Sequence, residues 1–342
     1  MANVLVTGGA GYVGSHLLHP LVEAGHRAVV FDNLSRGFAE LVDEHQVPLV
    51  VGHLSDRAHL RSVLEKYQVD AILHFAALAY VGESTEHPDD YYRVNTVDAF
   101  SLLEEAISYR PQSPPAFVFS STCAVFGVPP SLPIAELCPR TPISPYGRSK
   151  LALEWMLEDL SRRYRFPAVI LRYFNAAGAD PQNGCGECHH PETHLIPLAI
   201  QAALDGTPLL IHGDDFDTAD GSAIRDFIHV RDLAAAHISA LDYLIAGGSS
   251  TDFNLGTGSG HSVREVIHCV ERVCRRPVFV QSGPRRLGDP PALVADPAKA
   301  RLLLNWHPRH SDLDQIVRDA LSWEQRRQGI AGLARPLTAD LR

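Results

Sequence analysis

A tyrosine and a lysine separated by three residues are the clearest candidates for acid–base chemistry in this sequence. At the start of a helix, the spacing of Tyr146 and Lys150 places both side chains on the same face. A tyrosine whose pKa is near 10 is a weak base at pH 7, and lowering that pKa by about 3 units requires about 4 kcal/mol of preference for the phenolate. The Lys150 ammonium can supply part of this preference, and the Thr122 hydroxyl can hydrogen-bond the reacting oxygen. We therefore predict Tyr146 as the base, with Lys150 and Thr122 as its catalytic partners.

A glycine-rich turn near the N-terminus is typical of a dinucleotide-binding site. Gly8, Gly11 and Gly14 follow the apolar run Asn3–Thr7 and lead into a segment with helical spacing. In such a turn the first glycine allows the sharp bend, the second lets the backbone approach a pyrophosphate, and the third permits close packing of helix on strand. The unpaired N–H groups at the helix N-terminus favour bound phosphates. Asp32 lies 18 residues after Gly14, close to the offset of about 20 residues at which a carboxylate contacts an adenosine ribose.

The carboxylate of Asp32 also bears on which dinucleotide binds. It would repel the 2′-phosphate of NADP, so NAD is the predicted cofactor, although Arg36 lies only four residues further on. A bound cationic nicotinamide would add to the charge of Lys150 and lower the pKa of Tyr146 further. The two motifs together predict an enzyme that removes a proton next to a hydride acceptor.

The composition predicts a globular protein and argues against several other classes. Of 342 residues, 45% are hydrophobic and 20% are charged, so the chain can bury a large apolar core. Thirty Lys and Arg against 40 Asp and Glu give a net charge of −10, which argues against a nucleic-acid partner. No run of 18 apolar residues occurs and the first residues lack a basic stretch, so we expect no membrane partner and a cytoplasmic location. Six cysteines are too sparse for a disulfide scaffold.

Alternating apolar and helical segments predict an α/β fold, a Rossmann-type doubly wound parallel sheet with a smaller, interleaved α/β substrate domain. The strands that we expect are Asn3–Thr7, Ala28–Asp32, Leu49–Val51, Ala71–Phe75, Phe117–Ser121 and Val169–Arg172, then 228–229 and 253–255. Their nearly continuous apolar character suits strands that are buried on both faces. The helices that we expect between them are Tyr12–Ala24, Asp56–Lys66, Asn95–Ser108 and Tyr146–Arg163.

The amino-acid composition changes after Asn175, where Gly, Pro, Asp and His become frequent. This change predicts a domain boundary. We expect a cofactor domain of residues 1–175, to which 226–258 return, and a substrate domain of residues 176–225 and 259–342. Pro20 removes a hydrogen bond to His16 and should kink or divide the first helix. Ser262 and Glu265 have the spacing of a capping box that opens a helix ending at Cys274.

The segment Cys185–His189 has the C-x-x-C-H spacing of a c-type haem attachment site, and together with His190 and His194 it also has the character of a metal site. No export signal accompanies the haem pattern, and no second cysteine pair completes a zinc site. We therefore expect no metal and no haem here.

Further motifs extend from Asn3 to about Trp306. Besides the glycine turn and the Tyr–Lys pair they are Asp32–Leu34, His74–Ala77, Val81–Ser84, Asn95, Ser120–Thr122, Arg172–Asn175, Arg225–His229 and Arg285–Asp289. With these motifs the sequence resembles the extended short-chain dehydrogenase/reductase family, and within it the UDP-glucose 4-epimerase group. The resemblance implies a seven-stranded parallel sheet, a smaller UDP-sugar domain and commonly a homodimer. The dimer helices would match Asp89–Ser108 and Tyr146–Arg163.

The resemblance also implies a reaction. NAD takes hydride from C4 of a UDP-sugar while Tyr146 removes the proton of the 4-hydroxyl; the 4-keto sugar turns over, and hydride returns to its other face. UDP-glucose and UDP-galactose are the first substrates that we expect, with UDP-glucuronate, UDP-xylose and N-acetylated UDP-hexosamines as alternatives. A nucleotide-sugar dehydratase is less favoured, because Cys123 and Ala124 stand where dehydratases usually place an acid pair after the threonine. A decarboxylase is also less favoured, because it would require a hexuronate and the sequence offers no decisive clamp for the carboxylate. A non-enzymatic NAD-binding regulator is also less favoured.

Matched position by position, the resemblance implies two sets of contacts. Those to the cofactor are Gly8, Gly11, Tyr12, Val13, Gly14, Asp32, Asn33, Leu54, Phe75, Ala76, Ala77, Asn95, Ser120, Tyr146, Lys150 and Tyr173. Those to the substrate are Thr122, Tyr146, Phe174, Asn175, His194, Leu195, His212, Arg225, Arg286, Asp289 and Leu293. Within the second set, Arg225 and Arg286 would neutralise phosphate, because arginine donates two parallel hydrogen bonds to phosphate oxygens. Asp289 would contact the uridine ribose.

Five positions depart from the family pattern. His194 stands where some members have asparagine, and His212 stands where an aromatic ring often lies near uracil. His53 stands where an acidic residue often contacts adenine, and Ala79 replaces a basic residue near the nicotinamide ribose. Leu293 stands where some hexose-restricted members place tyrosine. The smaller side chain predicts room for a bulkier sugar substituent.

Overall fold

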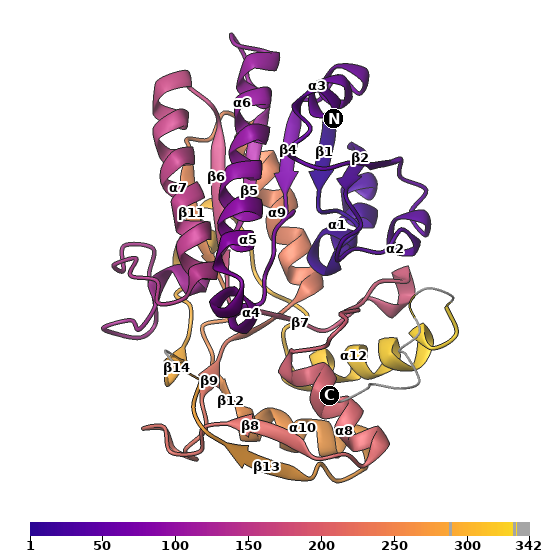
Figure 1. Ribbon diagram of the computed structural model, residues 1–342, viewed down its shortest axis with the longest axis vertical. Helices are drawn as coiled ribbons and strands as arrows, with labels where there is room; N and C mark the ends of the chain where they lie inside the picture. The colour runs from indigo at the N-terminus through magenta and orange to yellow at the C-terminus, as the bar shows by residue number, and fades with distance from the viewer. Residues whose placement is uncertain (287–288, 331–332, 334–342) are drawn as a thin grey trace.

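The computed structural model describes residues 1–286, 289–330 and 333, and its largest part is a seven-stranded sheet (Figure 1). The strands run in the order β11-β6-β5-β4-β1-β2-β3, and every neighbouring pair is parallel. Their bounds are β1 Asn3–Thr7, β2 Arg27–Asp32, β3 Leu49–Val51, β4 Ala71–His74, β5 Ala116–Thr122, β6 Ala168–Tyr173 and β11 Thr251–Leu255. The predicted parallel α/β sheet is confirmed, and its first six strands begin and end within one residue of the predicted bounds.

Helices cover both faces of this sheet (Figure 1). Helices α1 (Tyr12–Glu23) and α9 (Val230–Ile245) pack together on one face, and α3 (Arg57–Lys66), α6 (Ala99–Tyr109) and α7 (Pro145–Tyr164) lie on the other. The two faces have separate apolar clusters, one including Leu17, Leu21 and Leu233 and the other including Leu64, Leu103 and Leu157. Burial on both faces explains the continuous apolar runs of the central strands. The doubly wound arrangement is therefore confirmed.

Two helices differ from the expectation. Helix α1 continues through Pro20 to Glu23, so the prediction that this proline divides the helix is wrong. Pro20 lies in the last turn, where it costs one hydrogen bond to the His16 carbonyl, while Leu17 and Leu21 of the same helix are fully buried in the core. The helix predicted from Asn95 begins as a π-helix, η1 (93–98), before α6; π-helical turns are frequent at functional sites.

The smaller part lies in the lower half of Figure 1. Its helices α8 (Leu195–Asp205), α10 (Val263–Cys274) and α12 (Leu313–Arg327) share an apolar core. Three small sheets accompany these helices within the described residues. One pairs β7 Asn175–Ala177 with β10 Phe227–His229, and another pairs β8 Leu209–His212 with β13 Val280–Gly283. The third joins β9 Ile224–Arg225, β12 His261–Ser262 and β14 Ala292–Leu293. The predicted capping box is confirmed, because Ser262 Oγ accepts from Glu265 N at 3.0 Å and the Glu265 carboxylate accepts from Ser262 N at 2.7 Å.

The chain passes from the smaller part back to the large sheet. After β10, helix α9 packs on the large sheet and β11 pairs with β6 at its edge, so the two parts are interleaved in sequence. The domain boundaries themselves stay predictions, and residues 334–342 of the second predicted domain lie outside the described residues. The remaining short elements are α2 Glu40–Asp43, α4 Val81–Glu86, α5 Pro88–Tyr92, η2 Cys123–Phe126, η3 Pro181–Asn183 and α11 Ala298–Leu304.

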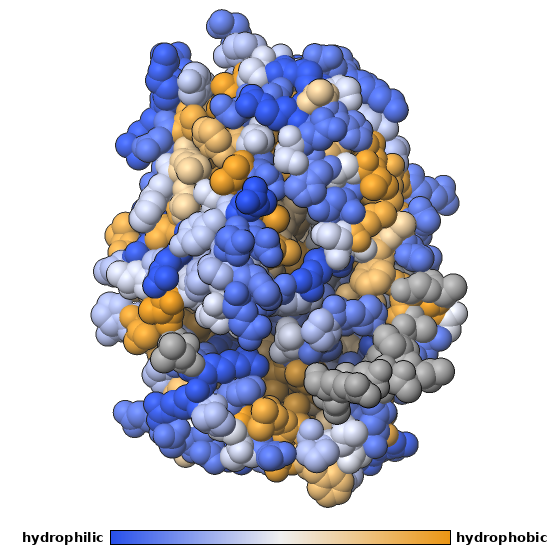
Figure 2. Space-filling model, in the orientation of Figure 1, coloured by the Kyte–Doolittle hydropathy of each residue, from blue (hydrophilic) through white to orange (hydrophobic). Residues whose placement is uncertain are grey.

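The surface is polar over most of the face in Figure 2, with scattered apolar side chains. It is hollowed between the large sheet part above and the smaller part below. Among the described residues, no helix combines the length and the apolar character that crossing a membrane requires.

Candidate active site

The glycine turn between β1 and α1 is built too tightly for side chains. Gly8 has a φ of +74°, and a Cβ at this residue would lie 2.4 Å from the backbone N of Ala76. A Cβ at Gly14 would lie 2.4 Å from the carbonyl oxygen of Gly8. Gly11 is the N-cap of α1 and supplies no side-chain cap, which leaves the first N–H groups of the helix for a ligand. The turn therefore has the shape and the polarity of a phosphate-binding loop.

Asp32, at the end of β2, holds this turn in place. One of its oxygens accepts from Ala10 N at 3.0 Å, and the other accepts from Leu34 N at 2.8 Å. Burial raises the pKa of the carboxyl, although these backbone hydrogen bonds oppose the shift. Sequence reasoning gave this side chain a contact with ribose and missed its bracing of the loop. Each carboxylate oxygen has a second lone pair, so the two roles are compatible.

The predicted catalytic residues lie together at the carboxyl end of β5. Helix α7 begins there, because Ser144 caps it by accepting from Gly147 N at 3.1 Å and Pro145 occupies its first turn. This start buries Tyr146 and Lys150 on the helix face that meets the sheet. Lys150 Nζ donates to the Ser120 carbonyl at 2.9 Å, and Thr122 ends the same strand, β5.

The predicted cofactor contacts line the same edge of the sheet. Strands β1 to β6 are parallel, so their carboxyl ends all lie at this edge. The predicted contacts lie in the last residues of these strands or just after them: Gly8, Asp32, Asn33, Leu54, Phe75, Ala76, Ala77, Ser120 and Tyr173. A crevice at the carboxyl ends of parallel strands is where such sheets bind ligands. Asn95 lies nearby on η1, where its amide bonds to both backbone groups of Leu78 and to Ser149 Oγ at 3.1 Å.

The predicted substrate contacts come mainly from the smaller part. Arg225 on β9 forms an ion pair with Asp289, so two side chains expected on phosphate and ribose contact one another. Arg286 is exposed beside His212, and burial together with that guanidinium lowers the pKa of the imidazole. The remaining positions are Phe174 and Leu293 in one apolar cluster, Asn175 at the start of β7, and His194 and Leu195 at the start of α8. Residues 287 and 288 of the Arg285–Asp289 motif lie outside the described residues.

Comparison with known proteins assigns the family. Residues 4–256 match the NAD dependent epimerase/dehydratase family. The chain belongs to this family. It is 48% identical over 321 residues to the UDP-glucose 4-epimerase of Rhizobium leguminosarum bv. trifolii, covering 94% of this chain and 96% of that one. The family resemblance drawn from the motifs is therefore confirmed.

Two solved structures have the same fold as this epimerase-family chain. The UDP-glucose 4-epimerase of Brucella ovis, in complex with NAD, matches with a TM-score of 0.89 and 48% identity, covering 94% of this chain and 98% of that one. The enzyme of Bifidobacterium longum, in complex with NAD⁺ and UDP, has a TM-score of 0.89 and 34% identity, covering 95% and 98%. The contact residues given above stay predictions for this family member.

The electrostatics of the protein alone differ from the expectation. Burial raises the pKa of Tyr146 to about 12, against the opposing hydrogen bond with Thr122. Burial also lowers the pKa of Lys150 to about 7, although Glu154 opposes the shift. Without a ligand, the lysine therefore does not make this phenol acidic, because desolvation outweighs its charge. The positive charge that lowers the pKa of Tyr146 has to come in part from a bound cofactor.

The lowered pKa of Lys150 predicts a pH dependence of stability. Between about pH 7 and pH 10 the unfolded chain binds more protons at this lysine than the folded, cofactor-free protein does, so stability rises with pH. In Lys150→Met this contribution is absent. In urea unfolding at pH 7, 8 and 9, the free energy of unfolding of the wild type should rise relative to that of the variant by up to about 1.4 kcal/mol per pH unit. A difference that is constant with pH would contradict the burial of a neutral lysine.

Gly8 offers a test of the phosphate-binding turn. Gly8→Ala places a Cβ against the backbone of Ala76 at a positive φ, so both cofactor retention and stability should fall. Gly25→Ala is the matched control, because Gly25 also has a positive φ, +84°, and a Cβ there meets nothing within 4 Å. The control should lose only the roughly 1–2 kcal/mol of a left-handed backbone and keep its cofactor. Equal cofactor content of the two variants, measured after denaturation, would show that the turn is not a binding loop.

The sequence did not identify several residues that position the predicted catalytic residues Tyr146 and Lys150. Ser149 joins α7 to Asn95, and its place three residues after Tyr146 on the helix was the available signal. His237 Nε2 lies 2.8 Å from Ser120 Oγ, behind the carbonyl that holds Lys150. Nothing in the sequence links His237 to Ser120, because the two are 117 residues apart.

The C-x-x-C-H segment folds differently from either pattern considered for it. Cys185 Sγ lies 3.0 Å from His45 Nε2, while Cys188 Sγ lies 3.8 Å from the guanidinium of Arg327. The two thiols therefore do not converge on one centre. His189 and His194 instead approach two carboxylates that the pattern did not include.

Proposed function

We propose that this protein is an NAD-dependent UDP-sugar 4-epimerase that inverts C4 through a transient 4-keto sugar, with UDP-glucose and UDP-galactose as its first substrates. The observation that carries the proposal is the buried Tyr146 at the sheet edge that also bears Thr122 and the glycine turn. The UDP-glucose 4-epimerase of Rhizobium leguminosarum bv. trifolii, 48% identical, supports the same activity.

The residues of the turn fit NAD. Gly8 and Gly14 leave a cradle that a Cβ would fill, and the uncapped start of α1 offers N–H groups to a pyrophosphate. Asp32 stands at the end of β2, where it can accept from a ribose hydroxyl besides its loop hydrogen bonds. When bound, NAD supplies the two-electron acceptor at C4 of the sugar.

This chain's own residues move and stabilise the proton. Tyr146 takes the proton of the 4-hydroxyl as C4 is oxidised, and it returns the proton when the ketone is reduced on its other face. Thr122 hydrogen-bonds the reacting oxygen, and Lys150, fixed on the Ser120 carbonyl, places its charge beneath the site. Lowering the pKa of Tyr146 from about 12 to near 7 corresponds to about 7 kcal/mol of preference for the phenolate. Lysine and cofactor cation together have to supply it.

The reaction is tested with the purified protein and UDP-glucose, without added NAD. We expect UDP-galactose to accumulate to an equilibrium mixture, because the cofactor is regenerated in each turnover. Bound NAD without any turnover would support the regulator instead. Release of CO₂ from UDP-glucuronate, or formation of a 4-keto-6-deoxy sugar, would support a decarboxylase or a dehydratase. Dehydration is disfavoured further because burial raises the pKa of the Cys123 thiol to about 12 and makes it a poor acid.

The preferred sugar remains part of the proposal. Leu293 lies in one apolar cluster with Phe174 and Cys123, the residue that follows Thr122. A leucine at this position leaves more room for a sugar substituent than a tyrosine would. Equal turnover of plain and N-acetylated UDP-hexoses would support this interpretation. Loss of all activity toward the N-acetylated sugars would contradict it, and UDP-xylose and UDP-glucuronate complete the panel.

A homodimer is the proposed assembly, and a cytoplasmic location stays a prediction from the sequence. Helix α7 and the adjoining π-helix η1 expose large apolar side chains, Trp155 at 52% and Val97 at 60%. Both lie on the helices that match the dimer helices of the family resemblance. Light scattering should give twice the mass of the 37.4 kDa chain, and a monomer mass would contradict the proposal.

A further inference from the structure

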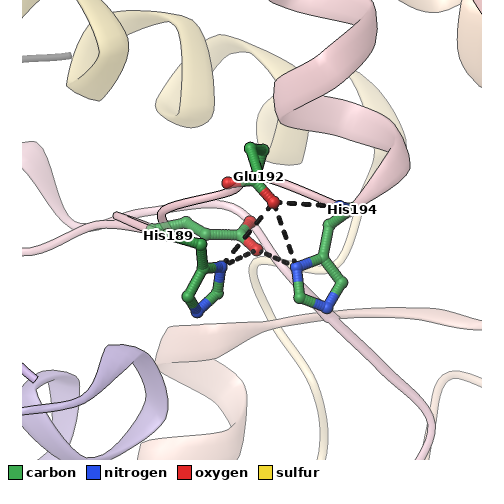
Figure 3. A group of neighbouring side chains, drawn as sticks. His189, Glu192 and His194 are labelled. Carbon is green, nitrogen blue, oxygen red and sulfur yellow. Dashed lines mark hydrogen bonds and ion pairs between the residues drawn. The ribbon is translucent and has the colours of Figure 1, made fainter. Parts of the chain in front are cut away.

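Four side chains just before α8 form a cluster of two imidazoles and two carboxylates. His189 Nδ1 lies 3.1 Å from Glu187 Oε1 and 3.6 Å from Glu192 Oε1. His194 Nδ1 lies 2.5 Å from Glu187 Oε1 and 3.3 Å from Glu192 Oε1. All four atoms are within 4.8 Å of one another, and Figure 3 shows both rings with Nδ1 turned toward the carboxylates. One atom from each residue therefore faces the same small volume.

Three of the four facing atoms lack hydrogen-bond partners within the described residues; the exception is Glu192 Oε1. Glu187 is 8% exposed, and its Oε1 is buried without an acceptable hydrogen bond, as are the Nδ1 atoms of His189 and His194. The four histidine–glutamate separations are those of ion pairs, and none of them has the geometry of a hydrogen bond. A buried carboxylate oxygen left in this state is costly unless another group satisfies it.

We propose that Glu187, His189, Glu192 and His194 bind one divalent transition-metal ion of the zinc class. Two carboxylates and two neutral imidazoles carry a charge of −2, which one divalent cation neutralises. Tetrahedral ligands at about 2.1 Å from a metal are about 3.4 Å apart, and three of the four nitrogen–oxygen distances lie within about 0.3 Å of that value. The fourth has to lengthen as the ion enters. Nitrogen and oxygen donors together suit zinc and its neighbours better than calcium or magnesium.

The surroundings orient these ligands. Glu192 Oε1 accepts from the backbone N of Thr193 at 2.7 Å and of His194 at 2.9 Å, which fixes its carboxylate. The rings of Tyr12 and Tyr80 meet the His189 ring edge-on, with centroids 6.1 and 5.5 Å away. Hydrogen bonds to a ligating carboxylate, such as those to Glu192, are typical of metal sites, where they set the direction of the ligand.

The position of the cluster defines what the ion does. Tyr12 begins α1 directly after the glycine turn, Tyr80 follows β4, and His194 is the N-cap of α8 in the smaller part. Four protein ligands leave no open position, which is the arrangement of structural rather than catalytic zinc. The ion therefore fixes the segment before α8 against the cofactor part. The earlier expectation of no metal considered the cysteines, which do not take part.

The rival interpretation is an ion-pair cluster without metal. Burial opposes protonation of both imidazoles, but Glu187 and Glu192 outweigh it and raise the pKa of His189 to about 9 and of His194 to about 10. In that state two imidazolium ions would pair with two carboxylates. The ion pairs and the metal make opposite demands on the histidine protons, so metal binding distinguishes them.

The experiment measures metal on the holoenzyme. Protein treated with a chelator and then titrated calorimetrically with Zn²⁺ should bind one equivalent, and Zn²⁺ should raise the melting temperature by roughly 5–10 °C. His189→Gln and Glu192→Gln should each weaken the binding by at least about a hundredfold. His190→Gln is the matched control, because His190 is exposed and lies outside the four-residue cluster.

Two readouts make the test decisive. Co²⁺ added to the wild type should give the visible absorption of a tetrahedral site, and this readout needs no variant. Wild type that binds no Zn²⁺ or Co²⁺ after chelation would overturn the proposal in favour of the ion-pair cluster. Equal Zn²⁺ affinity of folded His189→Gln and His190→Gln would also overturn it. Metal content is independent of sugar turnover, so this result stands apart from the proposed epimerase activity.

Discussion

Tyr146→Phe is expected to lower turnover of the UDP-sugar by roughly 10²–10⁴-fold while the protein keeps its NAD. The substitution removes the group that takes the proton of the 4-hydroxyl but retains the ring, which is buried against Tyr91 with centroids 6.3 Å apart. Among the described residues, the hydrogen bonds of the glycine turn do not involve the Tyr146 hydroxyl. The rate of epimerisation and the NAD content of the denatured protein are the two measurements.

Tyr164→Phe is the matched control for this variant. Tyr164 ends the same helix and is 43% exposed, so removal of its hydroxyl should leave the rate unchanged. If Tyr146→Phe retained more than a tenth of the wild-type rate, Tyr146 would not be the base. If it lost both NAD and turnover, the phenol would belong to the cofactor site rather than to proton transfer.

The sequence could predict that Tyr146, Lys150 and Thr122 lie together, because local geometry places each of them. Tyr146 and Lys150 share a helix face, and Thr122 ends a strand whose apolar character marked it clearly. The glycine turn could be predicted equally well, since a tight bend and close packing of helix on strand each require a residue without a side chain. These signals depend on neighbours within a few residues.

Long-range pairings could not be predicted in the same way. Arg225 and Asp289 lie 64 residues apart and pair with one another, and no spacing rule reports such a contact. In the segment before α8 the cysteines dominated the pattern, whereas the histidines meet Glu187 and Glu192. The fold of an irregular segment decides which donors converge there.

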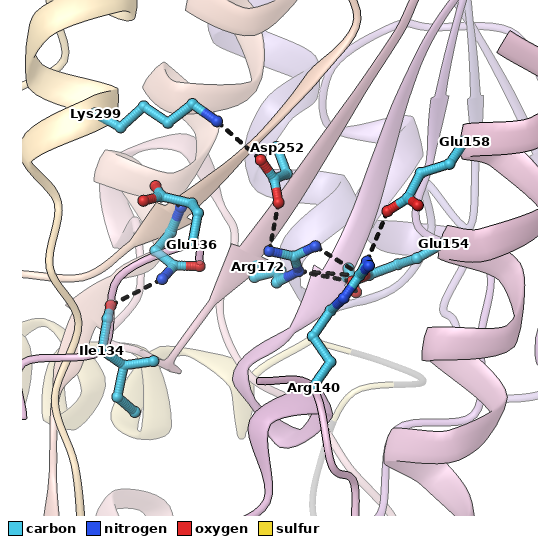
Figure 4. Close-up of polar contacts among 10 residues, drawn as sticks. Ile134, Glu136, Arg140, Glu154, Glu158, Arg172, Asp252 and Lys299 are labelled. Carbon is cyan, nitrogen blue, oxygen red and sulfur yellow. Dashed lines mark hydrogen bonds and ion pairs between the residues drawn. The ribbon is translucent and has the colours of Figure 1, made fainter. Parts of the chain in front are cut away.

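A buried ion-pair network joins helix α7 to strand β6 of the sheet (Figure 4). Glu154 lies one turn after Lys150 and is fully buried. Its carboxylate accepts from Arg172 on β6 at 2.8–3.1 Å, from Arg140 at 3.2 Å and from Ser121 Oγ at 2.5 Å. Arg172 is also fully buried and donates to Asp252 at 2.6 Å.

Glu154→Ala is therefore expected to lower the free energy of unfolding by about 3–5 kcal/mol, because it leaves the buried Arg172 guanidinium without its main counter-charge. Glu158→Ala is the control: this residue pairs with Arg140 from a partly exposed position, so its loss should cost about 1 kcal/mol or less. Urea unfolding of both variants measures the difference. Equal stability of the two would mean that Asp252 and solvent satisfy Arg172 without Glu154. Because Glu154 also raises the pKa of Lys150, the variant should lower the pKa of this lysine further. The buried ion-pair network and the charge of Lys150 are thus coupled through one carboxylate.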